Sequence, residues 1–132
     1  MRLVLPCLAV LVLSAVPARP AGHCETNPES PWCTAKTIYV DSRSGFMRET
    51  ELERGILQIP EFARSGLKVT RMSQGADLVL EVRRKAFTSQ FTLTVVDQRS
   101  HIVLASDRAN SIGGHIEPKL AKEFVKMLKN YR

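Results

Sequence analysis

The chain has 132 residues, of which 44% are hydrophobic and 24% are charged, and its formal net charge is +6. This length suits one domain of ordinary size, and the normal apolar fraction excludes an intrinsically disordered chain. Seven Gly and seven Pro without a regular period exclude collagen-like and low-complexity proteins. Aromatic residues make up 6% of the chain and do not alternate with basic ones, so we expect no nucleic-acid partner.

Residues 1–18 have the pattern of a secretory signal peptide. Arg2 supplies a positive charge, and an apolar run follows from Leu3 to Val16. This run is shorter than the roughly 20 apolar residues that a transmembrane helix needs. Small residues favour cleavage after Ala18. We therefore expect an exported protein, periplasmic or extracellular, that is soluble after cleavage and has no transmembrane segment in its mature chain; the alternative is an uncleaved anchor.

The cysteines support export. Cleavage would remove Cys7 and leave Cys24 and Cys33, and a pair of cysteines in an exported chain predicts a disulfide. This bridge would close a turn-rich loop in an irregular leader, residues 19–35. A metal site that uses His23 would lack a second ligand pair elsewhere in the sequence, so we expect no metal site. Neither Cys7 nor Cys24 has the position of a lipid-modified cysteine, which follows a small residue at the end of the apolar run.

A single domain is expected over residues 36–132. In its first half the hydrophobic pattern changes from the period of a strand to that of a helix. Alternating β-branched residues predict a strand over 37–41. From Thr50 the apolar residues follow the spacing of one helical face. Pro60 should interrupt this pattern with either a kink or a new short turn over residues 60–64, which Gly66 should stop.

The second half predicts a meander of strands and a final helix. A short strand is expected over 67–71, and alternation of apolar and polar residues predicts strands over 76–83 and 87–97. A third strand of the meander is expected over 101–106. Short turns between these strands predict antiparallel pairing. After a loop, Glu117-Pro118 should begin a helix, because proline is tolerated at the first helical position.

These elements predict an α+β fold. We expect a two-layer sandwich in which a mixed sheet of about five strands packs two helices on one face. The apolar side chains of the central strands would face these helices. The opposite face of the sheet would meet water, and its polar side chains would include Glu81, Arg83, Thr92 and Thr94.

Four segments carry a resemblance to known proteins: Lys36–Ser42, Ala76–Val82, Phe91–Asp97 and Ile102–Ser106. They resemble a group of small uncharacterised exported bacterial proteins. More distantly, they resemble periplasmic modules of envelope assembly, such as the curli secretion lipoprotein and the N-terminal domain of the Tol–Pal protein TolB. The distant resemblance implies a non-catalytic docking domain. Those hairpins often carry Gly at the turn, whereas this chain has Arg99-Ser100-His101.

The sequence offers no catalytic constellation. A Gly-x-Ser-x-Gly motif is lacking, and both mature cysteines are expected to be bonded. Asp41, Asp77 and Asp97 lie at strand ends, where we expect them to accept hydrogen bonds from turns. Residues 111–114 precede the last helix and are candidates for holding an anion. Their spacing matches no phosphate-loop fingerprint, so we interpret them as a turn.

Arg83, Arg84 and Lys85 are the best candidates for contact with an anionic component, such as lipid head groups or polyanionic glycans. We therefore expect a non-catalytic binding or docking module of the bacterial envelope, without a cofactor. Its partner would be an envelope protein or an anionic envelope component. The partner would bind either to the basic run of Arg83, Arg84 and Lys85 or to the polar face of the sheet. One alternative is a divergent hydrolase, which a cavity with convergent polar groups would favour. The other is a self-associating structural subunit, which a long unprotected edge strand would favour.

Overall fold

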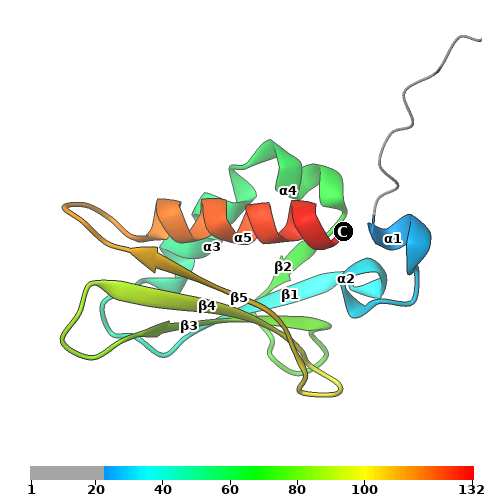
Figure 1. Cartoon of the computed structure of the whole chain (residues 1–132), viewed down its shortest axis with the longest axis horizontal. Helices are drawn as coiled ribbons and strands as arrows, with labels where there is room; N and C mark the ends of the chain where they lie inside the picture. The colour runs from blue at the N-terminus through cyan, green and yellow to red at the C-terminus, as the bar shows by residue number, and fades with distance from the viewer. Residues whose placement is uncertain (1–22) are drawn as a thin grey trace, which may run out of the picture.

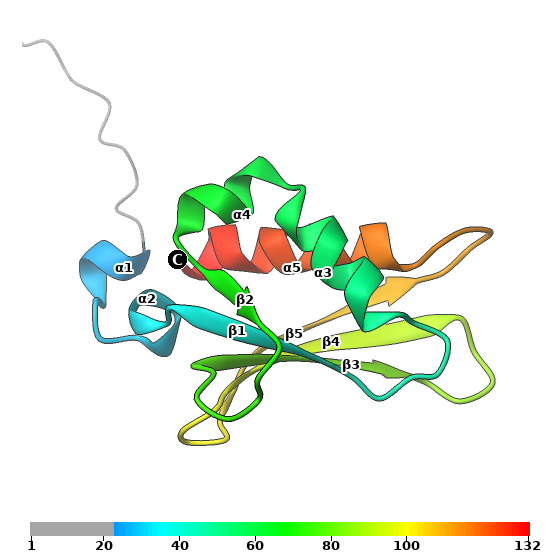
Figure 2. The same ribbon diagram turned by 180° about the vertical axis from the view of Figure 1, so that it is seen from behind.

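The computed structural model describes residues 23–132, so Cys7 and the signal peptide expected over 1–18 lie outside the described residues. In chain order its elements are α1 (His23–Thr26), α2 (Pro31–Thr34), β1 (Thr37–Ser42), α3 (Glu49–Leu57), α4 (Pro60–Ser65), β2 (Lys68–Thr70), β3 (Leu78–Arg84), β4 (Gln90–Asp97), β5 (Val103–Asn110) and α5 (Glu117–Tyr131). Helices α3, α4 and α5 cover one face of the sheet (Figure 1). The view from behind shows no helix of the described chain on the other face (Figure 2).

The sheet is mixed and has the strand order β2-β1-β3-β4-β5. Strand β1 pairs in parallel with both β2 and β3, whereas β3, β4 and β5 form an antiparallel meander. Helices α3 and α4 supply the long connection that the parallel pair β1–β2 requires. The α+β fold with a mixed five-stranded sheet is therefore confirmed.

The helices differ in number from the two that the sequence predicts. The described chain has five, because α3 and α4 are separate and the leader holds the two short helices α1 and α2. Pro60 is the first residue of α4, and Ile59 before it is extended, with ψ 118°, as the residue before a proline prefers. Gly66 ends α4 in the left-handed region, with φ 78°, as expected. Helices of four residues leave no periodicity in the sequence, so α1 and α2 could not be predicted from spacing.

The meander differs from the prediction at its ends. Strand β4 begins at Gln90 rather than Phe87, and β5 continues to Asn110 through residues expected to form a loop. Gln90 pairs with Asn110, and the β4–β5 register shifts at Val95/Val96. This bulge and the exposed polar residues of β5 remove the alternation that marks a half-buried strand.

Two residues other than glycine adopt a left-handed backbone, Phe87 with φ 60° and His101 with φ 59°. His101 lies in the β4–β5 turn. Histidine is among the residue types that tolerate this region, whereas a bulky aromatic residue there costs about 1 kcal/mol or more. Phe87 therefore lies in the β3–β4 hairpin at a conformational cost.

The core lies between the sheet and the helices. It includes apolar side chains that are at most 2% exposed: Ile38, Val40, Leu52, Ile56, Phe62, Leu78, Leu80, Val82, Leu93, Val95, Leu120, Phe124 and Leu128. Helices α3 and α5 approach closely at Gly55, where an added Cβ would lie 3.2 Å from that of Ala121. The Arg48 amide donates to Glu117 Oε1 at 3.3 Å, which links the residues around the starts of α3 and α5. Both helices therefore begin at the same end of the sheet.

Among the described helices, none combines the length and the apolar character that crossing a membrane requires.

Candidate functional site

Three connections lie together at one end of the fold: the β1–α3 connection (residues 43–48), the β3–β4 hairpin (85–89) and the β5–α5 loop (111–116) (Figures 1 and 2). We call this end the loop end. The Ser111 amide donates to the Ser89 carbonyl at 2.9 Å and so joins two of the three connections. The opposite end carries α1, α2 and the β4–β5 hairpin. Residues distant in sequence are thus brought together at the loop end.

The structure separates the three predicted anion-contact residues. Arg83 is exposed, and its Nη2 lies 3.7 Å from Glu81 Oε2. Arg84 follows it in β3 and points to the opposite face, because successive side chains of a strand alternate. Lys85 is exposed in the hairpin. The basic run therefore surrounds the start of the β3–β4 hairpin instead of forming one flat patch.

Arg84 forms a cation–π pair with Phe46. Its guanidinium carbon lies 4.1 Å from the centroid of the Phe46 ring, and its Nε donates to the Thr88 carbonyl at 2.8 Å. The ring of Phe46 is nevertheless 73% exposed. The pair places a cation over the face of an aromatic ring at the surface of the loop end.

The three connections contain basic residues and no Asp or Glu. Arg43, Arg48 and Lys85 are exposed cations, and Asp41 Oδ2 lies 3.4 Å from the Nε of Arg43. Glu49 and Glu117, which adjoin the connections, accept backbone hydrogen bonds: Glu49 Oε1 from Ser42 at 3.0 Å, and Glu117 Oε1 from Arg48. The connections themselves therefore carry only cations, and the carboxylates lie at their borders in contacts within the chain.

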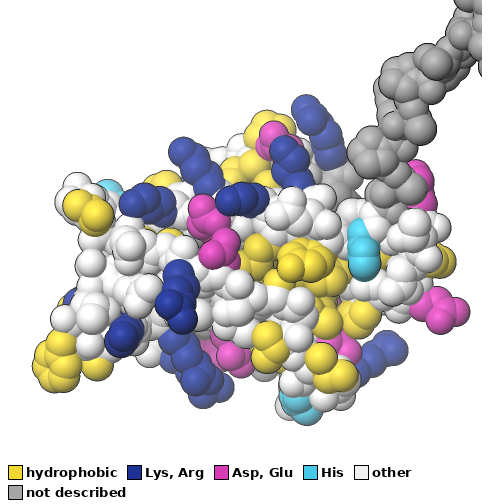
Figure 3. All heavy atoms as spheres, viewed as in Figure 1, with side chains coloured by type: hydrophobic (Ala, Val, Ile, Leu, Met, Phe, Trp, Pro, Cys, Tyr) yellow, Lys and Arg dark blue, Asp and Glu magenta, His cyan; other side chains and the backbone are white. Residues whose placement is uncertain are grey.

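Each connection also exposes one large apolar side chain. Phe46 is 73% exposed, Phe87 103% and Ile112 82%. Figure 3 shows hydrophobic side chains at this end of the molecule beside those of Lys and Arg. The sequence analysis missed these residues, because one apolar residue within a loop leaves no periodic signal.

Two hollows flank Phe46. The larger, about 700 Å³, is bordered by Arg48, Glu51, Arg54, His115 and Glu117. Glu51 and Arg54 form an ion pair at 3.4 Å, and Glu117 already accepts a backbone hydrogen bond. These contacts give Glu51, Arg54 and Glu117 structural roles.

The smaller hollow, about 360 Å³, adjoins Arg84, Ser89 and Ser111. The Ser111 hydroxyl donates to the Gly114 carbonyl at 3.2 Å, an acceptor that cannot act as a general base. Within residues 23–132, no three His, Cys, Asp or Glu side chains gather where they could hold a metal ion.

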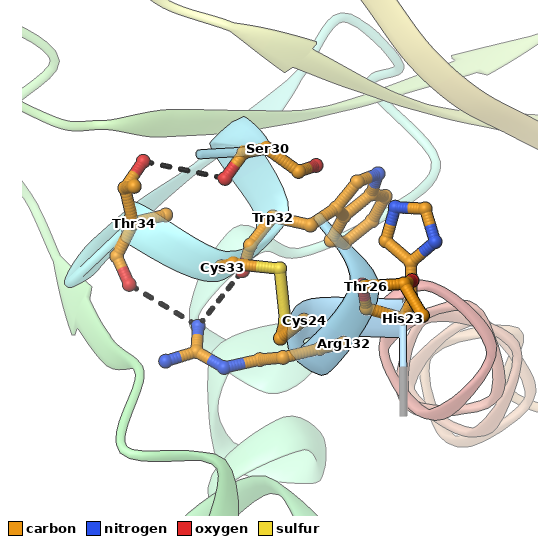
Figure 4. Close-up of a disulfide and its surroundings, with 9 residues drawn as sticks. His23, Cys24, Thr26, Ser30, Trp32, Cys33, Thr34 and Arg132 are labelled. Carbon is orange, nitrogen blue, oxygen red and sulfur yellow. Dashed lines mark hydrogen bonds between the residues drawn. A yellow bond between two sulfur atoms is a disulfide. The ribbon is translucent and has the colours of Figure 1, made fainter. Parts of the chain in front are cut away.

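The opposite end is closed upon itself. A disulfide joins Cys24 and Cys33, whose Cα atoms are 5.5 Å apart, as the sequence predicts (Figure 4). The ring of Trp32 stacks on that of Tyr131, with centroids 5.3 Å apart. Arg132 Nη1 donates to the carbonyls of Trp32 at 3.2 Å and of Ala35 at 3.1 Å. The described part of the leader is therefore attached to α5, and we call this region the disulfide end.

The strand-end aspartates Asp77 and Asp97 accept hydrogen bonds at strand ends and turns. Asp77 Oδ2 accepts from the amides of Lys36 at 2.8 Å and Thr37 at 3.2 Å. The Lys36 hydrogen bond is the main cause that lowers the pKa of Asp77, and the bonds from Thr37 add to it against an opposing effect of burial. Asp97 Oδ2 accepts from the Ser100 hydroxyl at 2.6 Å. These carboxylates fix strand ends and turns.

A different carboxylate pair links α5 to β5. Burial raises the pKa of Glu123, and the neighbouring Asp107 raises it further, whereas Lys126 lowers it. Burial of the Glu123 carboxyl therefore disfavours its ionised form in the folded chain, and Asp107 adds to this effect.

The edge strands give little support to self-association. Strand β2, at one edge, has three residues, and β5, at the other, has eight. Strand β5 pairs with β4 through an irregular register and carries Asp107 and Arg108. Bulges and charges of this kind protect an edge from pairing with another chain.

Comparison with known proteins adds little. No protein-family model and no curated protein matches the chain. Among solved structures, the chain is similar to uncharacterized lipoprotein B from Nitrosomonas europaea, with 13% sequence identity and a TM-score of 0.34 over 74% of this chain and 76% of that one. This similarity is too weak to carry an argument. The resemblances to the curli secretion lipoprotein and to the N-terminal domain of TolB gain no support from these comparisons.

Proposed function

We propose that the chain is a non-catalytic docking module of the bacterial envelope, exported and soluble after cleavage of its signal peptide, which binds an anionic envelope component through the loop end. One observation carries the proposal: two of the three connections at one end of the fold carry exposed cations, Arg43, Arg48 and Lys85, and none of the three contains a carboxylate. The single domain expected over 36–132 would present this end to its partner.

Electrostatic attraction is the physical basis. Arg48, Lys85 and Arg83 are exposed at or beside the loop end. The positive ends of the α3 and α5 dipoles lie there too, and neither helix has a side-chain cap. Exposed charges act over a Debye length of about 10 Å at 0.1 M salt, so binding should weaken as salt rises.

The triple variant Arg83→Ser, Arg84→Ser, Lys85→Ser tests this function. It should lose salt-sensitive binding to vesicles that contain phosphatidylglycerol. It should also lose salt-sensitive binding to immobilised heparin, a polyanionic glycan without a bilayer. Lys122→Ser, Lys126→Ser, Lys129→Ser is the matched control, because it removes three exposed lysines of α5 away from the loop end. Circular dichroism would verify that both variants fold. Equal binding by the two triple variants would refute the proposal.

A further inference from the structure

We propose that the anionic component is a lipid bilayer, and that Phe46, Phe87 and Ile112 enter its interface while the surrounding cations bind lipid phosphates. This inference rests on the proposed function and names the surface that the loop end recognises. It adds the apolar side chains to a site otherwise defined by charge alone.

The distribution of the exposed apolar side chains is the first argument. Single exposed apolar residues are ordinary on protein surfaces. Here three connections at one end each expose one, by 73% at Phe46, 103% at Phe87 and 82% at Ile112. The β3–β4 hairpin and the β5–α5 loop also project beyond the sheet and helices in both views (Figures 1 and 2). A flat surface can therefore meet these loops before it meets the rest of the molecule.

The backbone of Phe87 is the second argument. Its φ of 60° is a conformation that glycine or asparagine adopts more easily than a bulky aromatic residue. Its ring is fully exposed, so the ring gains no burial in the isolated chain to offset this conformation. A conformationally costly residue at an exposed turn indicates a role outside folding. Burial of the ring in a bilayer interface supplies such a role.

The Arg84–Phe46 pair is the third argument. The hydrogen bond from Arg84 Nε to Thr88 holds the guanidinium 4.1 Å from the ring centroid. At a membrane surface, an aromatic ring can enter the interface while an attached cation stays at the phosphates. The pair thus combines the two chemistries that a bilayer presents at adjacent depths.

The same combination favours a bilayer over a polyanionic glycan. A glycan would bind the cations and would leave the apolar side chains in water. A bilayer with anionic lipids attracts the cations and also offers an apolar layer beneath them. Insertion of the loop end would direct the disulfide end away from the membrane.

The first experiment measures partition of the purified exported protein onto vesicles of phosphatidylglycerol and phosphatidylethanolamine. The double variant Phe87→Ser, Ile112→Ser should bind at least about tenfold more weakly, because apolar burial contributes to interfacial binding. Its binding to heparin should be unchanged. Met72→Ser, Ile102→Ser is the matched control, because Met72 is 70% and Ile102 60% exposed on turns at the other end of the fold, and it should bind vesicles like the wild type. Thermal unfolding should be similar for all three proteins.

A second measurement reports insertion directly. The chain has one tryptophan, Trp32, at the disulfide end, so the wild type is the natural control. The variant Phe87→Trp should gain fluorescence that bromine-labelled acyl chains quench, whereas the emission of Trp32 should not be quenched. Phosphatidylcholine vesicles alone should produce little binding and little quenching, because they lack net negative charge.

These results separate the inference from the function on which it rests. Two outcomes would overturn lipid insertion and leave anion docking standing. In the first, vesicle binding is lost in the basic triple variant but kept in Phe87→Ser, Ile112→Ser. In the second, the wild type binds heparin but not vesicles. Failure of the basic triple variant to alter binding to either target would overturn both. Loss of vesicle binding in the apolar variant, with heparin binding retained and quenching at position 87, supports the inference.

Discussion

The disulfide end and the loop end use aromatic side chains in opposite ways. Trp32 at the disulfide end is 3% exposed and stacks on Tyr131, and the backbone carbonyl of Trp32 accepts a hydrogen bond from Arg132. Phe87 at the loop end is 103% exposed and occupies a left-handed turn position. Aromatic burial contributes to stability at one end, while the other end leaves its aromatic ring in water.

The cations of the two ends differ in the same way. The guanidinium of Arg132 donates to two backbone carbonyls, whereas that of Arg84 donates to one and stacks on a largely exposed ring. Groups already satisfied within the chain have little left to offer a partner. Stabilising contacts are therefore concentrated at the disulfide end, and the proposed function assigns recognition to the loops that the sheet carries at its other end.

The largest expected effect is the difference in lost stability between alanine variants of Trp32 and Phe87. Trp32→Ala should lower the free energy of unfolding by about 3 kcal/mol, because it removes a buried ring. Phe87→Ala, its control at the loop end, should change stability by less than about 1 kcal/mol, because its ring contacts water. Urea unfolding measures both. Equal losses of stability would contradict the assignment of the two ends.

Removal of the disulfide should have the next largest effect. The loop-entropy model sets an upper limit of about 3 kcal/mol for so short a loop. Cys24→Ser, Cys33→Ser should cost less, about 1–2 kcal/mol, because Trp32 and Arg132 still attach the leader to α5. Wild-type protein unfolded with reductant should match this variant. Vesicle binding should be unchanged, and its loss would show that the disulfide end takes part in docking.

Asp77, which links the starts of β1 and β3, provides a test through pH. Its pKa is lowered in the folded state, so it contributes stability above its unfolded pKa of about 3.9, and this contribution is lost as pH falls through the folded pKa. Asp77→Asn should reduce stability by about 1 kcal/mol at pH 7. The difference between variant and wild type should vanish under strongly acidic conditions, as measured by urea midpoints across pH. A difference independent of pH would contradict a role for the charge.

Substitution of Glu123, midway between the two ends, should change stability the least. Its effect should be a gain, whereas substitution of Asp77 should cause a loss. Its pKa is raised, so wild-type stability falls as pH rises through the window above the unfolded value of about 4.3. Glu123→Gln should therefore gain about 0.5 kcal/mol at pH 7 and nothing below that window. Lys126→Gln removes the cation that opposes this shift and should lower stability at pH 7. Loss of stability in Glu123→Gln at pH 7 would contradict the raised pKa of Glu123 in the folded chain.

Much of the fold could be predicted from local pattern. The alternation of Leu78, Leu80 and Val82 marked a strand buried on one face, and Pro118 marked the start of α5. The pairing of Cys24 with Cys33 followed from the cysteine count. The extension of β5 to Asn110 could not be predicted, because an exposed edge strand next to a bulge carries no alternation.

The candidate site was predicted only in part. Arg83, Arg84 and Lys85 were recognised as a basic run, but their separation onto different sides of the hairpin follows from strand geometry at its end. Phe46 was missed because the cation–π pair joins it to Arg84, a residue far along the chain. Contacts of this kind depend on how β1 and β3 lie beside each other.

The sequence by itself determined the elements, the α+β class, the disulfide and the excess of positive charge, because periodicity and composition are properties of neighbouring residues. Only the tertiary structure decided that Phe46, Phe87 and Ile112 occupy one end of the molecule while Trp32 is buried at the other. The physical reason is the strand order. Parallel pairing of β1 with β3 and antiparallel pairing from β3 through β4 to β5 bring the three connections to the same end of the sheet.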